Sequence, residues 1–284
     1  LTRGSVFNYY LSPSVTGAYT RQWGDHFFKG MAGFQMELQE NSSEYMYKDG
    51  MLSEDIYSFD NANGTPYAAE ARSHWATMGM FARLNWNYRN IYFLEFSGRY
   101  DGSSRFAPDN RWGFFPSFSA GYDISRTPYF TKLNLPVSQL KVRVSYGRLG
   151  NQNGAGLYDY LGVMTLDPNN VNAWLLPGTG NKPAKGTISL TPKMISPYIT
   201  WEKVDSKNIA VDGNFWNALL GFTVEYFYQN RTDILTPKQA SIPYYTGLTL
   251  PDQNIGEVSN QGVELMLSHK NRINDINYGG HVGN

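Results

Sequence analysis

The residue types that most often carry chemistry are scattered through this sequence. The four histidines are His26, His74, His269 and His281. None belongs to a His-x-x-x-His pair, the spacing that places two zinc ligands on one helix face. Cysteine is absent, which excludes thiol catalysis and Cys-ligated zinc. No Gly-x-Ser-x-Gly segment supplies the nucleophile turn of a hydrolase. The sequence therefore predicts no catalytic residue, no metal site and no cofactor.

One acidic segment has a partial likeness to a calcium loop. Asp60-Asn61-Ala62-Asn63-Gly64 begins with the right residue type and has a glycine for the turn. However, the third position is Ala62, and no glutamate follows at the twelfth. Because a calcium loop needs oxygen ligands at both places, we predict no calcium site here.

Charge and composition exclude other classes of function. The 284 residues include 24 Lys+Arg and 24 Asp+Glu, so the formal net charge is zero. Phosphate binding requires a cationic excess, so no nucleic acid partner is expected. Aromatic residues make up 15% of the chain and charged residues only 17%, against about 25% in an average protein. This composition is opposite to that of a disordered chain.

The elements that must position any functional residue are strands, because apolar and polar residues alternate with a period of two. Six segments show this pattern: Ala32–Leu38, Ala76–Tyr88, Tyr92–Asp101, Leu140–Gly147, Phe222–Gln229 and Val263–Ser268. No segment of similar length has the 3.6-residue period of a helix. The predicted fold class is all-β.

The length of the strands favours a membrane barrel over a soluble one. Strands of soluble proteins average about 5–6 residues, whereas a tilted strand that crosses a bilayer has about 9–11. Several apolar faces also end in Tyr or Trp, as at Trp86 and Tyr88 or at Tyr226 and Tyr228, which is typical of interfacial aromatic girdles. We therefore predict a transmembrane antiparallel β-barrel. A soluble all-β carbohydrate-binding module remains the alternative.

The connections alternate in length. Those near Gln22–Asp25, Arg89–Asn90, Asp212–Ala218 and His269–Asp275 are short. Those at Gln39–Arg72, Gly102–Phe114, Arg148–Thr200 and Thr232–Ile255 are mostly long, while Asp123–Gln139 breaks the pattern. Short periplasmic turns and long extracellular loops are typical of outer-membrane barrels, so Arg148–Thr200 should be extracellular. About ten strands fit this arrangement.

Two sets of residues could meet a solute. The predicted lumen-facing positions carry both signs of charge, and we expect salt bridges or plug contacts there more than solute contacts. The lumen-facing residues singled out are Arg83, Glu95, Arg99, Arg143 and Glu225. In the long loops, flat aromatic rings beside amide side chains could bind sugar rings or simply pack. These candidate substrate-binding residues are Trp174, Tyr198, Tyr244 and Tyr245.

Six ordered segments carry a resemblance to a known family. They are Asp101–Phe106 (DGSSRF), Arg111–Tyr122 (RWGFFPSFSAGY), Leu140–Gln152 (LKVRVSYGRLGNQ), Thr200–Val204 (TWEKV), Tyr226–Leu235 (YFYQNRTDIL) and Asn254–Leu265 (NIGEVSNQGVEL). In order and spacing they are similar to the barrel portion of the SusC/RagA-type TonB-dependent outer-membrane transporters. Each segment also has a structural interpretation; Asp101-Gly102, for example, is first of all a turn signal.

The resemblance implies a barrel of about 22 strands with an N-terminal plug. It also implies residence in the bacterial outer membrane with many crossings, energy from a TonB complex, a SusD-like surface lipoprotein partner, and import of an oligosaccharide or, less often, a peptide. Residues 1–284 would form part of a single barrel domain, with the plug and the barrel-closing strand outside them. A structural or adhesive outer-membrane barrel is the second functional hypothesis.

Overall fold

The computed structural model describes residues 1–133, 135–162, 195–216, 219–237, 251–273 and 276–283, and within 163–194 only four two-residue strands. Its main element is one antiparallel sheet. The strands of this sheet are β1 (Thr2–Leu11), β2 (Ser14–Trp23), β3 (His26–Tyr47), β4 (Tyr67–Tyr88), β5 (Tyr92–Ser103), β6 (Trp112–Asp123), β7 (Val137–Asn151), β12 (Glu202–Phe215), β13 (Leu220–Pro237), β14 (Asp252–Ile273) and β15 (Ile276–Gly283). The prediction of an all-β antiparallel fold is confirmed.

The remaining elements are small. Two separate two-stranded ribbons pair β8 (Leu166–Asp167) with β11 (Ile188–Ser189) and β9 (Leu175–Leu176) with β10 (Ala184–Lys185). Short helices occur at η1 (Phe59–Asn61), η2 (Pro108–Asn110), η3 (Ile124–Arg126) and α1 (Pro128–Thr131). No helix in the described part of the chain is long and apolar enough to cross a membrane.

Each strand pairs with its neighbour in the chain, except that β1 and β2 share one position. The first half of β3 pairs with β2, and its second half pairs with β1. Pro13 interrupts the strand between them, because its ring removes a backbone donor, although its carbonyl still accepts from the Met36 backbone N–H at 3.0 Å. The eleven strands of the sheet therefore occupy the ten positions that were predicted.

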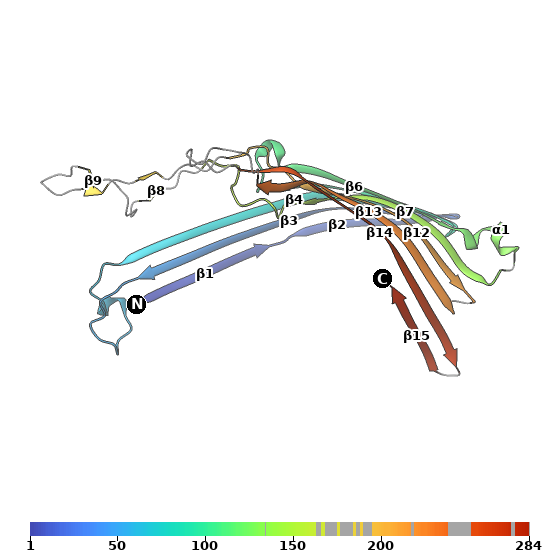
Figure 1. The fold of residues 1–284 in the computed structure, drawn as a ribbon, viewed down its shortest axis with the longest axis horizontal. Helices are drawn as coiled ribbons and strands as arrows, with labels where there is room; N and C mark the ends of the chain where they lie inside the picture. Colours follow the sequence, from blue (N-terminus) through green and yellow to red (C-terminus); the bar gives the residue numbers. More distant parts are fainter. Residues whose placement is uncertain are drawn as a thin grey trace.

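The sheet has two ends, which we name after their connections. Among the described residues, 24–25, 89–91, 124–133, 135–136, 216 and 219 lie at the turn end, and 48–66, 104–111, 152–162, 195–201 and 251 lie at the loop end. In Figure 1 α1 marks the turn end, and the connection that holds η1 marks the opposite, loop end. The sheet is strongly twisted, so that β15 runs across the direction of β1 in that view.

Several strands are longer than the sequence pattern predicted. β3 and β4 remain paired as far as Tyr47 and Tyr67, although the long connection was expected to begin near Gln39 and end near Arg72. The extra residues include Glu40, Glu44 and other polar side chains on the face that is apolar further down. Alternation of hydrophobicity therefore ends before the backbone pairing does, because a strand outside lipid no longer needs an apolar face.

The register separates two faces along the whole sheet. Directly paired residues share a face, so the pairs Leu84–Phe96, Phe96–Phe118 and Val211–Val224 all belong to one side, the apolar face. The opposite side, the charged face, carries the alternate residues. Phe96, Val224 and Leu265 are each 39–51% exposed on the sheet. Such a continuous exposed apolar surface is what a lipid-facing wall requires.

Rows of aromatic rings border the apolar face. At the turn end Tyr88, Tyr92 and Tyr122 follow one another on adjacent strands, with ring centroids 6.3 and 5.1 Å apart. Toward the loop end Tyr100 stacks on Trp112 at 5.0 Å and 9°. Tyr92 and Tyr100 are separated by roughly 27 Å along the strand, a length that suits a tilted crossing of the apolar core.

Candidate functional site

The charged face carries its cations next to carboxylates. In its centre, Arg143 donates to Asp212 at 3.1 Å and to Glu225 at 2.6 Å, across β7, β12 and β13. Thr223 donates a further hydrogen bond to the other Asp212 oxygen at 2.9 Å. The register that pairs Ala210 with both Arg143 and Glu225 brings these side chains together. Arg143 is therefore fixed between two carboxylates and is one of the charges most firmly held on this face.

The other predicted lumen-facing residues lie on the same face. Arg83 lies 3.6 Å from Glu95 on the adjacent strand. Arg99 forms two hydrogen bonds with Asp101, two residues along its own strand, at 3.1 and 3.0 Å. All five predicted positions thus share the charged face, and each is paired with an opposite charge. That this face borders the lumen stays a prediction.

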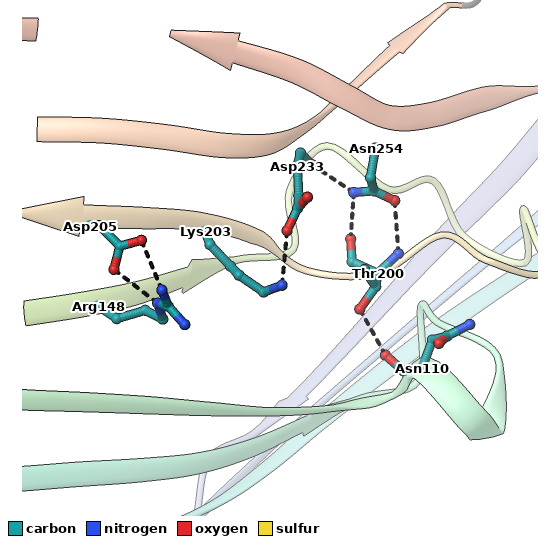
Figure 2. Close-up of polar contacts among 7 residues, drawn as sticks. All are labelled: Asn110, Arg148, Thr200, Lys203, Asp205, Asp233 and Asn254. Carbon is teal, nitrogen blue, oxygen red and sulfur yellow. Dashed lines mark hydrogen bonds and ion pairs between the residues drawn. The ribbon is translucent and has the colours of Figure 1, made fainter. Parts of the chain in front are cut away.

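At the loop end a hydrogen-bonded cluster ties four segments together (Figure 2). The Asn254 amide donates to the carbonyls of Thr200 and Asp233, at 2.9 and 2.6 Å, and its oxygen accepts from the Thr200 backbone N–H at 3.0 Å. The Thr200 hydroxyl donates to the Asn110 carbonyl at 3.2 Å. We call Asn110, Thr200, Asp233 and Asn254 the loop-end knot.

Ion pairs next to the knot fasten β12 to its neighbours β7 and β13. Lys203 donates to Asp233 at 2.8 Å, and Arg148 binds both oxygens of Asp205 at 2.9 and 3.0 Å (Figure 2). Asp233 adopts a left-handed backbone conformation with φ of 57°, at the point where the register between β13 and β14 shifts. The bulge turns its carbonyl toward Asn254 while its side chain meets Lys203.

A small apolar core lies beside the knot. Phe106, Phe115, Ala155, Ile199 and Trp201 are buried against one another. The indole of Trp201 packs 5.3 Å from both phenyl rings and donates its N–H to the Arg111 carbonyl at 2.9 Å. This core lies where the register between β6 and β7 stops at Ser117 and Gly147, so side chains replace strand pairing there.

Glu202 opens strand β12 at the loop end. It is 5% exposed, and its carboxylate accepts from the Asn151 amide at 2.8 Å and from the Leu235 backbone N–H at 3.3 Å. Neutral donors therefore satisfy this carboxylate, which links β12 to β7 and β13 at the loop end.

Of the four predicted substrate-binding aromatics, only Tyr198 lies within the described residues. Tyr198 is 80% exposed beside Pro197, whose carbonyl accepts from the Asn110 amide at 2.8 Å. Trp174, Tyr244 and Tyr245 lie outside the described residues. A role in substrate binding remains a prediction for all four.

The knot residues were missed as a group by sequence reasoning, although the quoted segments contain three of them. Thr200 opens one segment, Asp233 lies in another, and Asn254 opens a third. Their partners are 21 to 90 residues away along the chain, so no local pattern joins them. The order of the segments was the available signal, and it points to a shared structural framework as much as to a binding site.

The turn end has a different chemistry. Arg89 bridges two neighbouring turns by donating to Asp25 at 2.7 Å. This hydrogen bond and the carboxylate charge raise the pKa of the Arg89 guanidinium above its ordinary value. In the described part of the chain no three metal-ligating side chains come together, and Asp60 lies in the short helix η1.

Sequence comparison connects the whole chain with one family. The family model "TonB dependent receptor-like, beta-barrel" matches residues 2–282. The TonB-dependent receptor SusC of Bacteroides thetaiotaomicron is 29% identical over 273 residues, which cover 93% of this chain and 25% of SusC. TonB-dependent receptor P26 of Formosa agariphila is 29% identical over 248 residues, covering 85% of this chain and 24% of P26. The chain thus spans about a quarter of the length of these relatives.

Structural comparison gives the same fold. The RagAB peptide importer in its closed-closed state superposes with a TM-score of 0.79 at 22% identity, covering 99% of this chain and 30% of the other. The outer membrane transporter YddB from Escherichia coli superposes with a TM-score of 0.58 at 13% identity, covering 99% and 34%. The resemblance to SusC/RagA-type transporters inferred from the six segments is confirmed.

Proposed function

The chain belongs to the TonB-dependent receptor-like β-barrel family of the bacterial outer membrane, and on that premise we propose that its parent protein actively imports an oligomeric nutrient. Proteins of this family are transporters rather than enzymes, which agrees with a sequence that predicts no catalytic residue. The family also sets aside the soluble carbohydrate-binding module as an alternative.

The proposal rests on the sheet having one apolar and one charged face, together with the similarity of the chain to SusC. An exposed apolar face bordered by aromatic rings suits lipid, and the charged face behind it suits a water-filled or plugged lumen. On that charged face Arg83, Arg99 and Arg143 each have a carboxylate partner. Paired charges leave a weak net field, which suits passage of a large neutral solute.

An oligosaccharide is the proposed solute. The 29% identity to SusC extends over 93% of the chain, whereas the likeness to the RagAB peptide importer is one of fold. A bulky neutral oligomer is too wide for a narrow pore and has no charge by which a field could draw it in. An energised, wide barrel is a physical solution to that problem.

The proposed machinery extends beyond these residues. Residues 1–284 would form part of a single barrel domain, and a plug elsewhere in the parent protein would contact a TonB complex. A SusD-like surface lipoprotein would cover the loop end, where the knot and the exposed Tyr198 lie. In this orientation the turn end is periplasmic.

Growth of a strain that lacks the parent gene tests the proposal. The strain should fail on limiting oligosaccharide, grow normally on the matching monosaccharide, and recover when the gene is restored. Loss of the TonB complex should produce the same defect, because import needs its energy. A growth defect only on peptides would show that the imported oligomer is a peptide. Normal uptake of every oligomer tested would contradict import and favour a structural barrel.

A further inference from the structure

A pocket of about 190 Å³ lies on the charged face, at the middle of β3 and β4 and beside the loop-end half of β5. At about 30 Å³ for each water molecule, its volume corresponds to about six waters, on the order of one sugar ring. The lining residues used below are Gln35, Glu37, Gly79, Arg99, Asp101 and Gln152. Of these residues, Arg99 was among the predicted lumen-facing positions.

The sheet register assembles the pocket. Gly79 of β4 is paired with Gln35 on one side and with Asp101 on the other, so three adjacent strands contribute neighbouring positions. A Cβ atom built on Gly79 would collide with the Asp101 carboxylate. The glycine therefore makes room for this carboxylate in the wall, and almost any other residue would displace it.

Gln152 reaches the pocket from the end of β7, far from the other residues in sequence. Its side-chain oxygen is buried and has no hydrogen-bond partner in the described part of the chain. A buried amide oxygen without a donor is costly, so this atom is suited to accept from a hydroxyl group of a bound molecule. The buried indole of Trp201 adds an apolar surface to the same lining.

The charges in the pocket indicate which ligand it would take. Two carboxylates, Glu37 and Asp101, accompany one guanidinium, Arg99, so the formal net charge is −1. Arg99 donates to both oxygens of Asp101, which leaves other N–H groups of its five available. Gln35 donates to Glu37 at 3.2 Å. Donors and acceptors are thus adjacent, which suits hydroxyl groups, and the net negative charge opposes an acidic ligand.

We propose that this pocket is a wall subsite that binds one uncharged, hydroxyl-rich ring of the imported oligomer. The inference rests on the proposed function and on the charged face bordering the lumen. The pocket lies level with the ring pair Tyr100 and Trp112, close to the loop end. A solute that enters from that end would meet the subsite early in its passage.

The test uses the purified full-length parent protein in detergent and isothermal titration calorimetry. Uncharged hexasaccharides of glucose, mannose, galactose and xylose are titrated first, and the tightest becomes the probe, beside hexagalacturonate as the acidic counterpart. Gln152→Ala should weaken binding of the neutral probe about 3- to 10-fold, the effect of one lost neutral hydrogen bond. Asp101→Asn should weaken it about 10- to 100-fold, since a charged partner is lost.

Two further variants keep the test specific. Gln139→Ala removes the same side chain from another part of the wall, where Gln139 accepts from Asn214 at 2.8 Å, and should bind the probe like the wild type. Glu37→Lys changes the formal charge of the pocket from −1 to +1 and should raise the affinity for hexagalacturonate. Unchanged electrophoretic mobility before and after heating shows that each variant is folded.

The outcomes separate this inference from the proposed function. Wild-type affinity in Gln152→Ala and Asp101→Asn, in a parent protein that still imports the oligosaccharide, would overturn the subsite alone. Failure of the wild-type gene to restore growth on any oligosaccharide would overturn the proposed function itself. Equal weakening by Gln139→Ala would also overturn the subsite, because the effect would then belong to the wall in general.

Discussion

The two ends of the sheet are held by different kinds of contact. At the turn end many contacts are local: Asn90 is bonded to Asn87, three residues away, and Arg89 lies in a two-residue turn with φ of 52°. One side-chain contact, from Arg89 to Asp25, joins two turns that are 64 residues apart. At the loop end Thr200 is bonded to Asn110 and Asn254, 90 and 54 residues away. The turn end is therefore specified mainly by short segments, and the loop end by the assembled sheet.

This difference predicts where the wall is sensitive to mutation. A turn can be altered with little effect on other strands, because most of its partners lie in the same hairpin and the Arg89–Asp25 pair between two turns is exposed to solvent. The knot and its apolar core join segments that are far apart in the sequence, so loss of one of their residues should weaken several connections at once. The following changes, ordered by expected effect, test this contrast in the full-length parent protein.

The largest effect is expected at the two tryptophans that flank β12. Trp201→Ala removes a 6%-exposed indole from the loop-end core and should cost about 3–5 kcal/mol of unfolding free energy. Trp216→Ala removes a 55%-exposed indole at the turn end of the same strand and should cost much less. Urea titration in phospholipid vesicles, followed by electrophoretic mobility, measures both. Equal losses would contradict the contrast between the ends.

The next largest effect is expected from arginine substitutions on the two faces of β13. Val224→Arg should cost up to about 2–4 kcal/mol, the cost at the membrane midplane, because the side chain lies on the apolar face of β13. Thr223→Arg, one position along on the charged face, should cost much less, since a lumen-facing arginine stays hydrated. The same urea titration compares them, and similar costs would show that the faces are assigned wrongly.

A smaller effect is expected in the knot. Asn254→Ala leaves the carbonyls of Thr200 and Asp233 without their donor and should cost about 1–3 kcal/mol. It should also speed proteolysis of the loop end on whole cells. Asn260→Ala, an exposed position on the same strand, is the control and should change neither quantity.

The smallest effect is expected at the turn end. Arg89→Ala removes the bond to Asp25 between two exposed turns, and solvent screens such a pair. We expect no resolvable change in the urea midpoint. A shift as large as that of Asn254→Ala would mean that the turns, too, depend on contacts between hairpins.

The same contrast explains how much the sequence could reveal. Alternation predicted six of the strands and the apolar and polar faces of each, because a period of two is a local property. It placed the end of β3 near Gln39 instead of Tyr47, since pairing continues where the apolar face no longer does. The knot and the pocket around Gln152 were beyond prediction, because their residues meet only through the register of several strands.

The interrupted join between β6 and β7 has a mechanical consequence. These strands are hydrogen-bonded from Ser117–Gly147 to Asp123–Lys141, whereas β7 and β12 are bonded along nearly their whole length. Under a sideways load the wall should yield first along this shorter seam, and the tear should start at its loop end. At that end Trp201 connects the two sides of the opening, because its indole N–H donates to the Arg111 carbonyl. The force needed to separate β6 from β7 would then depend on the Trp201 indole more than on the length of the strands.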